Sequence, residues 1–198
     1  MRQLTRISFP AILLLAACAP PAADESGTLA HDAVGLARAE PSYVFKGDAG
    51  RYSASNPTLG IDARLDEGGA RISAGGAALK LNFTGFGRRE TLQNVPPVSP
   101  VAGVVPGTDR TRVEYAHDGI TVWWDNTSAG IQQGFSIERA PAGKGELALR
   151  IGVYGAMAES RGDAVVFRDQ SGGTWQYAGL GAEDAKGQAL PARMESVG

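Results

Sequence analysis

From residue 42 onward, the chain alternates hydrophobic and polar residues over several short stretches. The alternation is clearest over residues 61–65, 79–83 and 147–153. A period of two places one row of side chains in a core and the other in solvent, which is typical of antiparallel strands with one wet face. Further strands are predicted at Gly50–Ser55, Ala70–Ala74, Thr111–Tyr115, Ile120–Asn126, Gly134–Arg139, Val165–Arg168, Thr174–Leu180 and Leu190–Glu195.

The segments between these stretches have the composition of tight turns. The chain has 27 glycines, and several of them separate predicted strands, as in the sequence His117-Asp118-Gly119. An Asp-Gly pair tolerates the positive φ angles of a hairpin turn. No stretch after Arg38 has helical periodicity, and short strands every ~8–12 residues favour a sandwich or a barrel. We therefore predict one all-β domain over residues 42–198, an antiparallel β-sandwich of jelly-roll-like or Greek-key topology.

One segment interrupts this rhythm. Val95–Pro106 contains four prolines, and proline cannot donate to the hydrogen-bond ladder of a central strand. The segment is predicted either to cross from one sheet to the other or to form an exposed ligand loop, and we favour the crossover.

The N-terminus has the parts of a bacterial export signal. Met1–Ser8 carries two arginines and no acid, and Phe9–Ala16 is apolar. This apolar run is far shorter than the ~20 residues of a membrane-spanning helix. It ends in Leu15-Ala16-Ala17-Cys18, which fits a lipoprotein signal in which a peptidase cuts before the cysteine and the thiol is acylated. An ordinary secretory signal with an incidental cysteine is the alternative.

The lipoprotein interpretation divides the N-terminal region into a signal peptide, residues 1–17, and a lipidated flexible tether, residues 18–41. About three acyl chains on Cys18 would anchor the protein stably in a lipid bilayer. Ala19, rather than an acidic residue, follows the cysteine, which by resemblance to the enterobacterial sorting rule favours the outer membrane, facing the periplasm or the cell surface. The tether is rich in Ala, Pro and small polar residues and offers little to bury.

Composition narrows the possible partners. Without residues 1–17, the 19 basic residues fall to 17 against 21 acidic ones, a net charge of −4. Such a chain has no excess of positive charge to neutralise phosphates, so nucleic acid is not an expected partner. Cys18 is the single cysteine, so the domain has neither a disulfide nor a cysteine metal site.

The sequence offers little that indicates catalysis. It has two histidines, His31 in the tether and His117 in a turn, too few for a zinc site without cysteines. We interpret His117 as a solvated turn residue. Acidic turns at Asp163 and Asp169 leave calcium possible, but the calcium-loop pattern is absent. The sequence contains no hydrolase or nucleotide motif, and we predict no catalytic residue, no cofactor and no metal.

The sequence Trp123-Trp124-Asp125 is the one candidate for ligand binding. Adjacent residues of a strand point to opposite faces, so one tryptophan lies outside the core that the other fills. Trp123 on an exposed face beside Asp125 could stack on a sugar and bind its hydroxyls, whereas the alternative is that Trp123 is merely partly exposed. A hydrolytic site would pair Asp125 with Glu114 or Glu138 on neighbouring strands.

The stretch Tyr52-Ser53-Ala54-Ser55-Asn56-Pro57-Thr58-Leu59-Gly60 resembles the opening Y-x-A-x-N-P-x-x-G of a β-rich domain in large bacterial surface proteins that carry FG-GAP (integrin-α-like) repeats. Four later stretches are similar to that domain: Leu79–Gly87, Arg112–Tyr115, Thr121–Phe135 and Tyr177–Ala192. The resemblance implies a secreted, non-catalytic β-module. It also implies that Asn56, Pro57 and Gly60 are turn residues and that Gly134-Phe135 is a strand entry with a core aromatic.

In such proteins the domain continues through two more strands before the repeats, whereas this sequence stops at Gly198. We therefore expect either a module with an incomplete edge or a truncated reading frame. The function expected from the sequence is a lipid-anchored structural or adhesion-like interaction module at the cell envelope, with another envelope protein or a glycan as partner. The alternatives are a carbohydrate-binding module that uses Trp123 and Asp125 and, more distantly, a glycan hydrolase.

Overall fold

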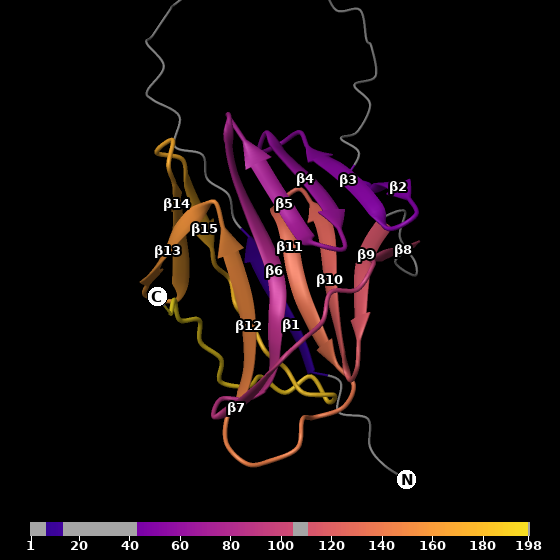
Figure 1. Ribbon diagram of the computed structural model, residues 1–198, viewed down its shortest axis with the longest axis vertical. Helices are drawn as coiled ribbons and strands as arrows, with labels where there is room; N and C mark the ends of the chain where they lie inside the picture. The colour runs from indigo at the N-terminus through magenta and orange to yellow at the C-terminus, as the bar shows by residue number, and fades with distance from the viewer. Residues whose placement is uncertain (1–6, 14–42, 105–110, 198) are drawn as a thin grey trace, which may run out of the picture.

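A computed structural model describes residues 7–13, 43–104 and 111–197 of the chain. Over these ranges the protein consists of β-strands and loops, with no helix. The strands form three antiparallel sheets, so the prediction of an all-β antiparallel sandwich is confirmed (Figure 1). No helix within the described ranges is long and apolar enough to cross a membrane. Cys18 and the predicted tether, residues 18–41, lie outside these ranges.

The larger sheet has seven strands in the order β12-β6-β5-β4-β3-β2, and β7 also pairs with β6. In β4 every second residue is buried, beginning with Ile61, and β6 alternates buried and half-buried side chains along its length. This alternation is the physical basis of the period of two seen in the sequence. The strand bounds are β2 Lys46–Asp48, β3 Arg51–Asn56, β4 Ile61–Asp66, β5 Gly69–Ala74, β6 Ala77–Arg88, β7 Thr91–Asn94 and β12 Leu147–Tyr154.

The second sheet has five strands in the order β1-β11-β10-β9-β8 and packs against the larger one. Its inner face contributes large apolar side chains to the shared core, among them Trp124, Phe135 and Ile137. The strand bounds are β1 Ile7–Leu13, β8 Val101–Val104, β9 Thr111–His117, β10 Ile120–Thr127 and β11 Gly130–Ile137.

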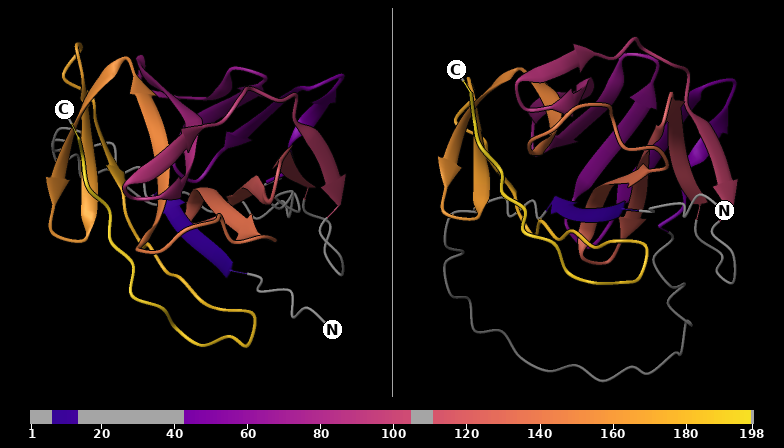
Figure 2. Two further views of the ribbon diagram at one scale, coloured as in Figure 1. Left: turned by 60° about the horizontal axis from the view of Figure 1, so that its bottom comes forward. Right: turned by 90° about the horizontal axis from the view of Figure 1, so that it is seen from below.

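The third sheet closes one side of the sandwich. It has the order β13-β14-β15, with bounds β13 Ala156–Arg161, β14 Ala164–Asp169 and β15 Thr174–Tyr177. At one end β13 follows β12 of the larger sheet, and at the other end β15 contacts β1 of the second sheet. Figure 2 shows the third sheet, in orange, at one side of the molecule. Phe167, Trp175 and Tyr177 from this sheet complete the core at that side.

The proline-rich segment crosses between the sheets, as predicted. Residues 95–100 connect β7, which pairs in the larger sheet, to β8, which pairs in the second. The later part of the segment forms β8 itself, Val101–Val104, at the outer edge of its sheet. An edge position is compatible with flanking prolines because only one side of the strand needs donors.

Two strand predictions need correction. Leu190–Glu195 is not a strand: Leu190 N donates to Ala182 O at 2.8 Å in a loop, and in the remainder only Met194 is partly buried. Without a buried row, this segment has nothing to hold it in a ladder. The strand predicted at Gly134–Arg139 begins earlier, at Gly130, so Gly134 lies in the middle of a strand and does not begin one.

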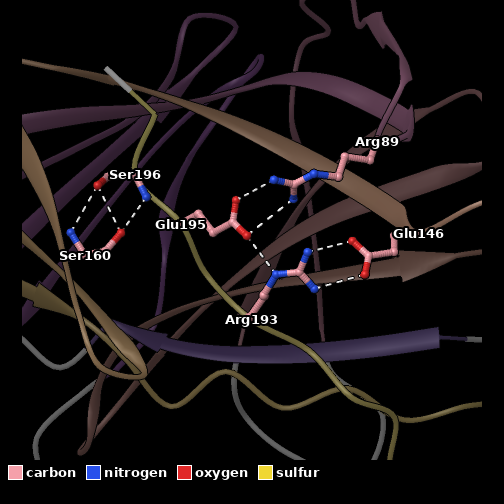
Figure 3. A network of polar contacts seen from close by, with 6 residues as sticks. All are labelled: Arg89, Glu146, Ser160, Arg193, Glu195 and Ser196. Carbon is pink, nitrogen blue, oxygen red and sulfur yellow. Dashed lines mark hydrogen bonds and ion pairs between the residues drawn. The ribbon is translucent and has the colours of Figure 1, made fainter.

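Instead of pairing in a sheet, the chain end is tied to the domain by polar side chains (Figure 3). Arg193 binds Glu146 at 2.6 Å and Glu195 at 2.7 Å, and Arg89 binds Glu195 at 2.9 Å. Hydrogen bonds from Arg89 and Arg193 lower the pKa of Glu195 to about 2. Because these ion pairs are exposed, each contributes little to stability, although together they define the path of the segment.

Buried polar side chains join the two large sheets. Asn56, at the end of β3, donates through Nδ2 to Asn126 Oδ1 of β10 at 2.9 Å and to Thr127 O at 2.7 Å. Asn126 Nδ2 donates in return to Ser55 O at 3.0 Å, and Asn56 Oδ1 accepts from Leu59 N at 3.1 Å. Asn56 therefore shapes the turn that ends at Gly60, which has a φ of 63°, and also joins the layers. The turn implied by the resemblance is confirmed.

A second link, from Tyr115, gives a testable prediction. Its hydroxyl donates across the sandwich to Asp66 O at 3.0 Å and lies 3.3 Å from Gly69 O. We expect Tyr115→Phe to lower the free energy of unfolding by about 1 kcal/mol, because the hydrogen bonds that this hydroxyl makes across the sandwich are lost. Tyr154→Phe, at a tyrosine that is 54% exposed, is the control and should cost nothing measurable. Equal urea midpoints for the two variants would contradict this role of Tyr115.

Candidate functional site

The predicted ligand-binding residues lie on the outer face of the second sheet. Along β10 the even-numbered residues, including Trp124, face the core, and Trp123 and Asp125 point the other way. The structure nevertheless places both in the interior, since Trp123 is 5% and Asp125 2% exposed. The expectation of a partly exposed tryptophan is therefore wrong.

Arg112 on β9 covers both Trp123 and Asp125. Its guanidinium forms a bidentate pair with Asp125, with Nε to Oδ1 at 2.9 Å and Nη2 to Oδ2 at 2.7 Å. The same guanidinium lies over the ring of Trp123, 3.9 Å from the centroid. The hydrogen bond to Asp125 raises the pKa of Arg112. One cation thus engages a carboxylate by its edge and an aromatic ring by its face, as arginine is suited to do.

Gly134 on β11 supplies the other boundary of the cluster. It is directly opposite Trp123 in the register of β10 and β11. A Cβ at Gly134 would stand 1.9 Å from Cζ2 of Trp123, so the ring lies flat across this position. We call Arg112, Trp123, Asp125 and Gly134 the outer-face cluster.

Arg112 was missed in the sequence analysis, although a signal for it exists. The turn at Asp118-Gly119 pairs Ile120 with His117. Counting five residues away from the turn along each strand then brings Asp125 opposite Arg112. A carboxylate and a guanidinium at opposing positions predict a cross-strand ion pair. No comparable sequence signal predicts that the ring of Trp123 lies on Gly134, because the position of the ring depends on the side-chain rotamer of Trp123.

The cluster does not have the arrangement of a sugar site or a glycosidase. Stacking requires an open aromatic face, and Trp123 is enclosed. Both oxygens of Asp125 accept from Arg112, which suits a structural ion pair better than proton transfer. Glu114 is opposite Trp123 in the ladder and is exposed. Glu138 is also exposed and accepts from Thr121 Oγ1 at 3.3 Å.

His117 is not the solvated turn residue that the sequence suggested. It ends β9 on the inner face, and its ring packs against Phe83 with centroids 5.3 Å apart. Burial lowers the pKa of His117, and a hydrogen bond to the Pro96 carbonyl partly opposes that change. The ring lines a small, partly open pocket of about 20 Å³ that Tyr115 and Gln133 also line. A space of this size holds about one water molecule.

The described parts of the chain contain no group of three or more histidine, cysteine, aspartate or glutamate side chains arranged to hold a metal ion. At the acidic turn of Asp169, which the sequence analysis considered for calcium, the carboxylate binds groups of its own turn. Asp169 Oδ1 accepts from Ser171 N at 2.9 Å, Ser171 Oγ at 2.7 Å and Gly173 N at 2.8 Å. These hydrogen bonds, first of all the one from Ser171, lower the pKa of Asp169 and give the carboxylate a structural role in the turn.

The N-terminal segment is the remaining feature. Residues Ile7–Leu13, which the sequence predicts to belong to a signal peptide, form β1 and pair antiparallel with β11 from Ile7↔Ile137 to Leu13↔Ile131. Comparison of the chain with protein-family models, curated proteins and solved structures gives no match. The relationship to the FG-GAP-associated domain therefore stays a prediction.

Proposed function

We propose that the protein is a bacterial lipoprotein, anchored in the outer membrane through acylated Cys18, whose β-sandwich is a non-catalytic structural or interaction module at the cell envelope. The observation that carries the proposal is Leu15-Ala16-Ala17-Cys18 after a short apolar segment with a basic start. The single cysteine of the chain stands where lipidation requires it. The resemblance of Tyr52–Gly60 to a domain of surface proteins supports the same assignment.

The outer-face cluster also favours a module over an enzyme. Its carboxylate is bound by Arg112 and its aromatic ring is enclosed. The side chains best suited to bind a ligand or to take part in a reaction therefore hold neighbouring strands together. Hydrogen bonds between the layers, such as those of Asn56 and Asn126, further favour a rigid body. A rigid β-sandwich on a lipid anchor suits presentation of a surface to another envelope protein.

The proposal predicts the fate of a Cys18→Ser variant. In a bacterial host, we expect the wild-type protein to lose residues 1–17, to gain the mass of its acyl chains and to sediment with membranes. The variant should keep residues 1–17, gain no acyl mass and lose membrane sedimentation, because a hydroxyl cannot replace the thiol that is acylated. Intact mass spectrometry measures the acyl mass, and fractionation measures the membrane sedimentation.

Ala19→Ser, which keeps the thiol, is the control and should behave as wild type. An unchanged mass and unchanged sedimentation for Cys18→Ser would refute the proposal.

A further inference from the structure

The edge of β11 that faces away from β10 holds one extended strand. β1 pairs with it over seven consecutive positions without a register shift, and Figure 2 shows β1 along this edge. The β11 side chains that face the core, Ile131, Phe135 and Ile137, are at most 3% exposed with β1 in place. The pairing thus completes the backbone ladder at this side of the sheet.

β1 contacts strands of two different sheets. β1 pairs with β11 through backbone hydrogen bonds, and it also contacts β15 of the third sheet. Tyr177 of β15 donates to Gln133 Oε1 of β11 at 3.1 Å, which ties these two strands together. We call the space between β11 and β15 the strand slot. Because β15 stands beside it, the slot suits a single extended segment better than the sheet edge of a second copy of the protein.

Proline in the occupying strand indicates which of its amides face β11. Pro10 pairs with Gly134 and lacks an N–H, and proline in an edge strand sits where that group would point away from the ladder. Direction alternates along a strand, so Ile12 shares the outward orientation of Pro10, and Phe9 and Ala11 direct their N–H groups toward β11. A segment bound in the strand slot therefore needs a backbone N–H group at every second residue, directed toward β11.

We propose that the strand slot is an acceptor site for an extended apolar segment of another envelope protein, which adds antiparallel to β11 where β1 lies in the unprocessed chain. This proposal rests on the proposed function, because cleavage before Cys18 removes β1 and opens the slot. An unpaired β-strand edge beside apolar side chains binds extended segments through main-chain hydrogen bonds. The partner segment is apolar, like the sequence Ile-Ser-Phe-Pro-Ala-Ile-Leu of β1.

Hydrogen exchange on the full-length gene product tests the proposal. The processed wild-type protein in detergent is compared with unprocessed Cys18→Ser, which keeps β1. We expect those amides of residues 130–137 that point toward β1 to exchange at least about tenfold faster in the processed protein, because opening the edge removes their protection, whereas the amides that point toward β10 stay hydrogen-bonded. Amides of β5, in the middle of the larger sheet, are the internal control and should exchange equally in both.

A synthetic peptide of residues 7–13, with lysines added at both ends, is the probe of the open slot. It should restore protection of residues 130–137 in the processed protein. A peptide with Ala11→Pro should not, because it loses a donor toward β11, whereas the matched Ile12→Pro peptide should still bind.

Equal exchange at residues 130–137 before and after processing would overturn the inference and leave the proposed function intact, because the acyl mass reports that function separately. Processed protein that protects β11 by dimerising without peptide would overturn the single-segment occupant. Binding of the Ala11→Pro peptide as strongly as the Ile12→Pro peptide would overturn the strand-pairing mode.

Discussion

Replacing Gly134 with alanine is expected to lower the free energy of unfolding by about 3 kcal/mol, the upper end of the usual cost of overpacking a well-packed site. The added Cβ would lie 1.9 Å from Cζ2 and 2.2 Å from Cε2 of Trp123. The indole is rigid and held under Arg112, so it cannot move aside as the end of a flexible side chain could. Urea unfolding of the purified full-length variant measures the change.

The control for this experiment is Gly103→Ala in β8, where an added Cβ meets nothing within 4 Å. It should change stability by less than about 0.5 kcal/mol. The specificity of the clash is tested by repeating Gly134→Ala in a Trp123→Ala background. There the second substitution should cost much less, because the two sites are in direct contact and their effects do not add. A full cost for Gly134→Ala without the indole would contradict the arrangement.

Replacing Arg112 with alanine is the second large effect, an expected loss of about 3 kcal/mol. The side chain of Asp125 is 3% and that of Arg112 28% exposed. Removing the guanidinium leaves a buried carboxylate without its bidentate donor and uncovers the ring of Trp123. The loss should appear as a lower urea midpoint, together with a red shift of tryptophan fluorescence.

Two further variants test why Arg112→Ala should destabilise the protein. Arg112→Lys keeps the positive charge but loses the planar fork and the stacking on the ring, so most of the loss should remain. Arg139→Ala removes an ion pair with Asp118 whose side chains are 67% and 95% exposed, and an exposed pair contributes about 0–1 kcal/mol. A similar small loss for both Arg112→Ala and Arg139→Ala would show that burial of the Asp125 pair has no energetic consequence.

The outer-face cluster changes the meaning of the Trp-Trp-Asp sequence. Two tryptophans on opposite faces suggested one core residue and one ligand-binding residue. In the folded protein both serve packing, Trp124 between the sheets and Trp123 between Arg112 and Gly134. The proposed interaction surface therefore moves from an aromatic face to the β11 edge, where backbone groups provide the binding.

The sequence by itself was sufficient for the fold class and for most strands, because alternation at positions such as 61–65 records which side chains one face buries. It was insufficient where no face is buried. β13, Ala156–Arg161, was missed because all but one of its side chains are exposed, and pairing with β14 stabilises it without leaving an alternating pattern.

What only the tertiary structure decided is the set of contacts between segments distant in sequence. Alternation places Trp123 and Asp125 outside the core, but it cannot say that Arg112 and a glycine on the next strand enclose them. His117 is likewise half-buried, with Phe83 from the other sheet packed on its ring. Strand periodicity is a local property of the backbone, whereas burial of an outward-facing side chain depends on register, rotamers and neighbouring strands, which the packed sheets determine together.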